Sequence, residues 1–140
     1  MLFRSPLAGG FLTGKYKREN TDNAGRLSGA NPFGNSKFLD RNWNILEVLE
    51  AVAKECGATA AQVALAWVLA KPGVGSTIIG ASKISQLDSN IAATHIKLNE
   101  QQMIRLNDAS APPMGFSASL VQPLIRRMVF GGHNVAGWGE

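Results

Sequence analysis

The sequence predicts an α/β fold in which parallel strands are connected by helices. The predicted order is a short strand at residues 2–5, two helices, a second strand at residues 76–79 and two further helices. Strands separated by helices are typical of right-handed crossovers between parallel neighbours. Two strands are too few for a parallel sheet, because its faces must be covered and its edges paired or closed. We therefore expect the chain to be part of a larger sheet or barrel.

The composition indicates a globular protein of one domain. Of the 140 residues, 45% are hydrophobic and 17% are charged, which excludes the disordered and fibrous classes. No apolar run reaches the roughly 18 residues that span a bilayer, and the first residues lack the apolar segment of a secretory signal. These features predict a cytoplasmic protein with no membrane partner.

The cysteine content and the charge distribution exclude a disulfide and make a metal site and a nucleic-acid partner unexpected. Cys56 is the only cysteine, so an intramolecular disulfide is excluded and no metal site is expected. The net charge of +4 comes from scattered Lys and Arg residues without interleaved aromatic side chains. Nucleic acid is therefore not expected as a partner, and a phosphorylated small molecule fits better.

The first half of the chain predicts a long loop followed by two helices. Residues 21–36 are rich in Asn, Gly, Ser and Pro, which is typical of a loop. An amphipathic helix is expected over residues 38–57, ended by Gly57. Its apolar stripe consists of Leu39, Trp43, Leu46, Leu49 and Ala53.

The second helix has a clear start signal. Thr59 and Gln62 have the spacing of a capping box, and Pro72 and Gly73 stop the helix. Apolar residues occur on nearly all faces of this helix, which predicts that most of its surface is buried. Without the rest of a barrel, we expect the helix at Ala60 to Ala70 to expose apolar surface through which the chain self-associates.

A β-branched run between glycines, Ser76 to Ile79, predicts the second strand. The helix after it is expected to begin at Ser82 as N-cap. Its apolar residues at helical spacing are Ile84, Leu87 and Ile91. Asn99 and Gln102 predict the cap of a last short helix.

Two stretches have features of phosphate sites. Gly9, Gly14 and Lys15 match the spacing of a nucleoside-triphosphate loop, but Tyr16 stands where that loop needs a short hydroxyl for magnesium. The second stretch, Gly80 to Asn90, joins a strand to a helix. There the backbone N–H groups of Gly80 and Ala81, the Ser82 hydroxyl and the Lys83 ammonium converge on an anion. Ordinary helix capping is the alternative interpretation of that stretch.

Three motifs in order, "SPLAGGFLTGKY", "ATAAQVALAWVLAKPGV" and "IIGASKISQLDSN", resemble the C-terminal portion of an aldo-keto reductase over about Ser5 to Ser110. The resemblance implies part of a (β/α)₈ TIM barrel, incomplete as given, and an NADP-dependent oxidoreductase that reduces a small-molecule carbonyl to an alcohol. It implies one partial domain over residues 1–140. Within it, residues 1–16 form strand seven and a cofactor loop, 21–36 a long loop, 37–110 the helices and strand eight, and 111–140 a C-terminal tail.

The resemblance also assigns roles to residues. Those next to the nicotinamide-side ribose and the pyrophosphate are Ser5, Pro6, Leu7, Ala8, Gly10 and Lys15. Those next to the 2′-phosphate, ribose and adenine are Gly80, Ala81, Ser82, Lys83, Gln86 and Asn90. In the family a C-terminal loop closes over the substrate, which implies substrate contacts for Met128, Phe130 and Trp138; packing of the tail outside the barrel is the alternative.

The sequence departs from the family pattern at several positions. Ser89 stands where a carboxylate commonly holds adenine, and Arg4 stands where an aromatic ring commonly stacks on nicotinamide. The family uses a tyrosine as general acid, but Tyr16 is the only tyrosine and already matches the Gly-Lys-Tyr motif. His95 and His133 are expected in solvent or packing roles. We therefore expect no catalytic residue in this chain. A non-enzymatic NADP(H)-binding or regulatory module, as in potassium-channel β-subunits, or an inactive truncated product remains the alternative.

Overall fold

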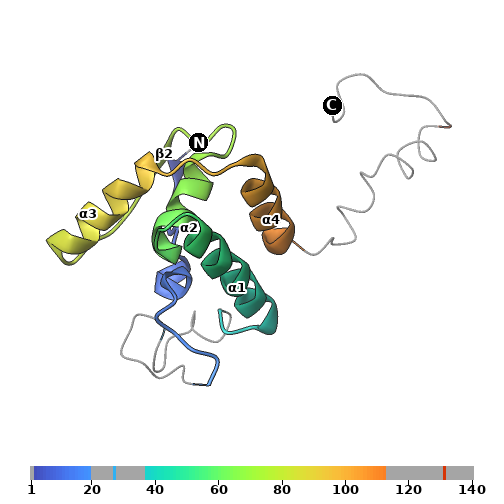
Figure 1. Ribbon diagram of the computed structural model, residues 1–140, viewed down its shortest axis with the longest axis horizontal. Coiled ribbons are helices and arrows are strands. Elements are labelled where there is room, and N and C mark those ends of the chain that lie inside the picture. Colours follow the sequence, from blue (N-terminus) through green and yellow to red (C-terminus); the bar gives the residue numbers. More distant parts are fainter. Residues whose placement is uncertain (1, 20–26, 28–36, 113–130, 132–140) are drawn as a thin grey trace. The chain divides into compact units, whose positions relative to one another are not determined.

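The computed structural model describes residues 2–19, 27, 37–112 and 131 (Figure 1). The chain divides into two units, Met1–Ser110 and Ala111–Glu140, and nearly all described residues belong to the first. Most of the expected loop at residues 21–36 lies outside the described residues. The same holds for His133 and for the three predicted substrate contacts, Met128, Phe130 and Trp138.

The described residues are mostly helical. The elements in order are β1 (Leu2–Phe3), η1 (Ala8–Thr13), α1 (Asp40–Glu55), α2 (Ala60–Leu69), β2 (Ser76–Thr77), α3 (Ile84–Ala92), η2 (Ala93–His95) and α4 (Glu100–Ser110). No helix among these is long and apolar enough to cross a membrane.

The two strands pair in parallel, with Leu2 opposite Ser76 and Phe3 opposite Thr77. The predicted extent of the second strand, to Ile79, is wrong, because β2 ends at Thr77. Ser5 has a φ of 56°, a left-handed conformation that takes the chain out of the extended region. β1 therefore offers no further partner to the residues after Thr77.

Helix α1 buries the predicted apolar stripe except at its start. Trp43, Leu46 and Leu49 are buried, but Leu39 is 57% exposed because it is the N-cap residue and precedes the helix. Gly57 has a φ of 61°, the left-handed conformation that commonly follows a helix C-terminus. The predicted end of the helix is confirmed.

Helix α2 lies at the centre of the described structure and packs against η1, α1, α3 and η2. The predicted capping box is confirmed: Gln62 N–H donates to Thr59 Oγ1 at 3.2 Å, and Thr59 N–H donates to Gln62 Oε1 at 3.0 Å. The prediction that this helix exposes apolar surface is wrong for most of its length, and Leu69, its last residue, is 37% exposed. Six of its residues are buried, because the surrounding elements of the same chain cover it.

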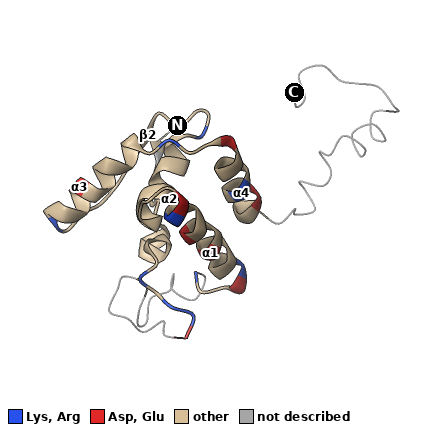
Figure 2. Ribbon diagram, in the orientation of Figure 1, with Lys and Arg blue, Asp and Glu red and all other residues tan. Residues whose placement is uncertain are grey.

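Helix α3 carries three exposed apolar residues at helical spacing. Ile84 is 79% exposed, Leu87 42% and Ile91 51%. Figure 2 shows that this helix is almost uncharged, with Asp88 its one charged residue. α3 packs mainly against α2 and η2, and Gln62 Nε2 donates to the Ser89 carbonyl at 3.2 Å.

Two further contacts hold the remaining elements in place. Phe11 of η1 contacts Trp43 of α1 edge to face, with ring centroids 4.8 Å apart. At the C-terminal end of α1, Glu55 pairs with Arg105 of α4. The predicted cap of α4 is confirmed, because Gln102 N–H donates to Asn99 Oδ1 at 2.9 Å.

Candidate functional site

The parallel pairing of β1 and β2 brings the two predicted cofactor segments to one edge. Phe3 and Thr77 are register partners, so the chain leaves both strands at the same end. The carboxyl ends of parallel strands are where α/β folds place ligands. The loop that leads from Ser5 into η1 and the loop that leads from Gly80 into α3 therefore begin side by side.

The first loop has an unusual backbone. Ser5 and Ala8 have positive φ angles of 56° and 50°, and Gly9 and Gly10 follow with 71° and 94°. Ala8 N–H donates to the Ser5 carbonyl at 3.0 Å, which closes the first turn. Left-handed residues other than glycine cost energy, and they cluster at ligand sites where the surrounding structure fixes them.

Gly10 leaves room for the ammonium group of Lys15. A Cβ atom on Gly10 would lie 3.0 Å from Lys15 Nζ, closer than nearly all real Cβ contacts. The same ammonium lies 5.0 Å from the centre of the Tyr16 ring, within cation–π range. The loop thus holds a cation against its own backbone, and this donor set fits the phosphate groups of a dinucleotide.

The second loop has free donors at the start of a helix. The backbone N–H groups of Lys83, Ile84 and Ser85 have no acceptor among the described residues. Such groups, together with the helix dipole, favour an anion. Gly80, Ala81, Ser82 and Lys83 are all exposed. This arrangement also fits a phosphate.

The predicted N-cap of this helix is wrong. Lys83 holds the N-cap position and makes no capping bond with its side chain. Ser82 instead donates from its N–H and its hydroxyl to Gln86 Oε1, at 3.0 and 3.1 Å. These two predicted cofactor residues are therefore bonded to each other, whereas Asn90 lies further along α3 and is partly buried.

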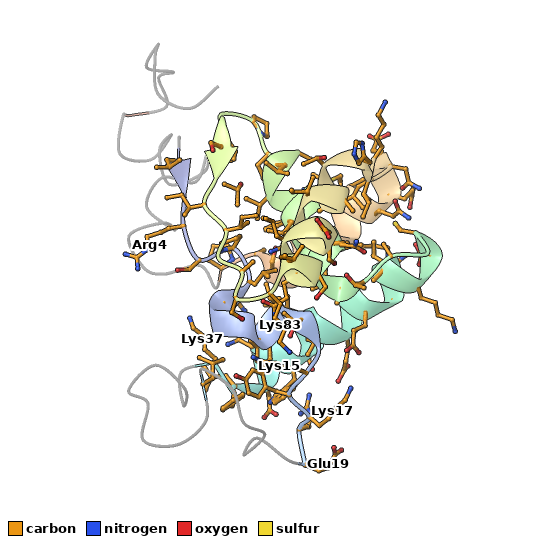
Figure 3. All side chains as sticks on the ribbon, turned by 90° about the vertical axis from the view of Figure 1, so that its left-hand side faces the viewer. Arg4, Lys15, Lys17, Glu19, Lys37 and Lys83 are labelled. Atoms are coloured by element: carbon orange, nitrogen blue, oxygen red, sulfur yellow. The ribbon has the colours of Figure 1, made fainter. Side chains whose placement is uncertain are left out.

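Lysine side chains from three segments lie on this side of the molecule (Figure 3), and the Glu50 carboxylate lies beside Gly14. In Figure 3, Lys15, Lys37 and Lys83 occupy the same part of the view, although they come from three separate segments, and Arg4 points away from them. The one labelled carboxylate, Glu19, lies further off. The charge on this side favours an anionic ligand.

The described residues place no acid–base group at this edge. Tyr16 is completely buried, and its hydroxyl accepts a hydrogen bond from Leu27 N–H at 3.1 Å. His95 is exposed on η2. In the described part of the chain, no group of three His, Cys, Asp or Glu residues could hold a metal ion.

Comparison with known proteins identifies the family. The model of the aldo/keto reductase family matches residues 2–111, which is more than half of the chain. The chain belongs to the aldo/keto reductase family. An uncharacterized oxidoreductase of Mycobacterium tuberculosis is 43% identical over 106 residues, which are 76% of this chain and 32% of that protein.

Two plant relatives of this aldo/keto reductase chain have more specific names. A probable aldo-keto reductase 1 of Glycine max is 42% identical over 75% of the chain and 30% of its own length. A probable voltage-gated potassium channel subunit beta of Arabidopsis thaliana is 36% identical over 66% of the chain and 29% of its own length. The chain thus spans about a third of the curated relatives it matches.

Some residues that position the site were not found from the sequence. Gln62 was predicted as a capping residue, but its amide also holds α3, which carries two of the predicted cofactor residues, Gln86 and Asn90. Lys37 was also not predicted from the sequence as a cation near the site. Both roles depend on contacts between segments far apart in the chain, and no local pattern signals them.

Proposed function

We propose that this chain supplies the dinucleotide-phosphate site of an NADPH-dependent reductase that converts a carbonyl to an alcohol. In this proposal β1 and β2 correspond to strands seven and eight of a (β/α)₈ barrel. A bound NADPH would supply the hydride. The chain's own contribution is to bind and orient the cofactor, and Met128, Phe130 and Trp138 remain proposed contacts of the carbonyl substrate.

The observation that carries this proposal is the parallel pairing of β1 and β2. Because the strands run in parallel, the loops after Phe3 and after Thr77 start at one edge. Phosphate sites of β/α barrels form from the loops after strands seven and eight. Each loop carries a lysine, Lys15 or Lys83, and the second loop adds backbone N–H groups that have no acceptor among the described residues.

The two lysines have different proposed roles. Lys15 is held beside Gly10 in the first loop, where it would face the pyrophosphate. Lys83 is the N-cap residue of α3, where its ammonium and the free N–H groups after it would face the 2′-phosphate. The remaining proposed contacts of the first loop are Ser5, Pro6, Leu7 and Ala8. Those of the second loop are Gly80, Ala81, Ser82, Gln86 and Asn90.

A second candidate function is a non-enzymatic NADP(H)-binding or regulatory module. The burial of Tyr16 favours it, since the only tyrosine of the chain is a core residue and hydride transfer to a carbonyl needs a proton donor near the oxygen. The potassium channel beta subunit among the relatives is named for a role in a channel. This candidate shares the cofactor site and differs in lacking the reaction.

Fluorescence titration of the chain with NADPH and with NADH tests the cofactor site. We expect Lys83→Met to weaken NADPH binding by about tenfold and NADH binding much less, because a charge-assisted bond to phosphate is worth roughly 1.5–3 kcal/mol. Lys97→Met removes an exposed lysine outside both loops and serves as the control. Equal losses for the two cofactors would contradict the role of Lys83.

Reduction assays test whether this chain by itself reduces a carbonyl. A panel of aldehydes, incubated with the chain and NADPH, is expected to yield no alcohol, since no proton donor lies at the described edge. Binding of NADPH without turnover agrees with either candidate for this chain. Turnover that survives Tyr16→Phe would show that another group donates the proton.

A further inference from the structure

An apolar pocket of about 220 Å³ lies among η1, α1, α2 and α4. Each of the four elements contributes a large apolar side chain to its wall; these are Phe11, Leu49, Trp67 and Leu106. It lies behind the first loop, because Pro6 and Ala8 also line it. None of the predicted contacts on α3 belongs to it, so the pocket is separate from the proposed 2′-phosphate site.

The polar groups of the wall are mostly satisfied within the protein. Trp67 Nε1–H donates to Asn107 Oδ1 at 2.9 Å, and the Ser110 hydroxyl donates to the Leu106 carbonyl at 2.6 Å. A molecule in the pocket would therefore gain mainly apolar contact. An apolar cavity of about 150 Å³ is large enough to bind benzene, so this pocket has room for one ring with a short chain.

Lys37 is the one charged residue among the described residues that line the pocket. Lys37 lines it, and its ammonium has no ion pair or hydrogen bond with any other described residue. The Arg41 guanidinium donates to the carbonyl of Ser110, another lining residue, at 3.1 Å. None of the lining residues is acidic, and the nearby Asp40 is paired with Arg18 at 2.7 Å. The charge thus complements an anion.

We propose that this pocket binds a small carboxylic acid with an apolar body, such as an arylalkanoic acid. The ring occupies the space between Phe11 and Trp67, and the carboxylate faces the Lys37 ammonium. The site does not depend on the proposed cofactor function, because its wall is formed by α1, α2 and α4 as well as by η1. The choice of a carboxylate over a neutral or cationic molecule follows from Lys37.

Three probes of the same body and different charge test the proposal. The full chain is titrated with 3-phenylpropionate, 3-phenylpropan-1-ol and 3-phenylpropylamine, and the Trp67 Nε1–H resonance is followed by NMR. We expect the carboxylate to bind about fivefold more tightly than the alcohol, as a partly exposed ion pair of up to 1 kcal/mol allows. The amine is expected to bind most weakly. Equal affinities, or no shift of the Trp67 resonance, would overturn the proposal.

Variants locate the site. Lys37→Met keeps most of the side-chain length, and we expect it to reduce the affinity for the carboxylate to that for the alcohol. Lys54→Met, at an exposed position of α1 outside the pocket, is expected to leave both affinities unchanged. An equal effect of the two variants would contradict a specific role of Lys37. If Lys37→Met does not fold, the titrations of the parent chain are repeated in 0.5 M NaCl. We expect the added salt to remove the preference for the carboxylate over the alcohol. An unchanged preference would contradict the ion pair with Lys37.

Discussion

At the scale of single residues, Tyr16 is a motif residue that has a structural role in the core. Its ring contacts Phe38 edge to face, with centroids 5.4 Å apart. Its hydroxyl accepts the Leu27 N–H, and the whole side chain is buried. The tyrosine of the Gly-Lys-Tyr motif therefore anchors the segment after η1 in the core, and the centre of its ring lies 5.0 Å from the Lys15 ammonium.

Replacing Tyr16 by phenylalanine tests that role. The substitution keeps the ring but leaves the buried Leu27 N–H without its acceptor, so we expect the free energy of unfolding to fall by about 1–3 kcal/mol. Urea unfolding followed by circular dichroism measures it. An unchanged midpoint and slope would show that the hydroxyl bond contributes nothing to stability.

At the scale of elements, Gln62 connects two helices through the two ends of one amide. Its oxygen accepts Thr59 N–H in the cap of α2, and its nitrogen donates to the Ser89 carbonyl of α3. Gln62→Glu keeps an oxygen for the cap and loses the donor. We expect amide hydrogen exchange in α3 to rise by about two- to tenfold, while α2 stays protected.

Thr59→Ala is the matched control for that experiment. It removes the Thr59 hydroxyl that caps α2 and retains the bond from Gln62 to α3. We expect a loss of about 1 kcal/mol in global stability, with the exchange of α3 changed no more than that of α2. If both variants altered α3 alike, the bond to Ser89 would not be what holds that helix.

The contact between α1 and α4 predicts a dependence of stability on pH. Hydrogen bonds from Arg105 and Gln102 hold the pKa of the Glu55 carboxyl below its ordinary value near 4.5. Because the folded pKa is the lower one, the interaction stabilises the fold above about pH 4.5 and is lost as the pH falls through the folded pKa. The melting temperature of Glu55→Gln is therefore expected to change less between pH 6 and pH 3 than that of the parent chain.

Asp88→Asn provides the comparison for the pH experiment. Asp88 is an exposed carboxylate on α3 and makes no ion pair with another described residue. Its removal is expected to leave the acid dependence of the melting temperature as in the parent chain. A flattening as large as that of Glu55→Gln would mean that the dependence reflects net charge and not the pair with Arg105.

At the scale of the whole molecule, the largest correction to the sequence prediction concerns exposed apolar surface. We propose that the chain self-associates through the exposed apolar residues of α3. Substituting Ile84, Leu87 and Ile91 together by serine is expected to reduce the binding of a hydrophobic dye by roughly half or more, because these residues form a contiguous apolar surface.

A control triple variant with exposed apolar residues on other elements tests whether that surface is special. Leu39, Leu69 and Ile104 are 57%, 37% and 46% exposed, and their joint replacement by serine removes a similar number of apolar side chains. We expect little change in dye fluorescence. Sedimentation velocity reports whether either variant alters the oligomeric state.

The sequence predicted local features better than features that depend on distant neighbours. The caps of α2 and α4 each depend on residues three positions apart, Thr59 with Gln62 and Asn99 with Gln102, and both are present. The periodicity predicted that α2 is buried but not that α1, η1, α3 and η2 cover it, because these neighbours come from other segments of the chain. The assignment of the cofactor residues depends on the order of the three motifs and stays a prediction. The pocket has four contributing elements, so no single segment could signal it.

The contacts on either side of residues 20–36 have a consequence for limited proteolysis. Phe11 and Tyr16, before that segment, share one core with Trp43 after it, and Arg18 pairs with Asp40 across it at 2.7 Å. The ion pair is exposed and adds little, whereas the aromatic contacts are buried. A protease that cuts between Glu19 and Lys37 would therefore yield two pieces that migrate together on a native gel and separate only in denaturant.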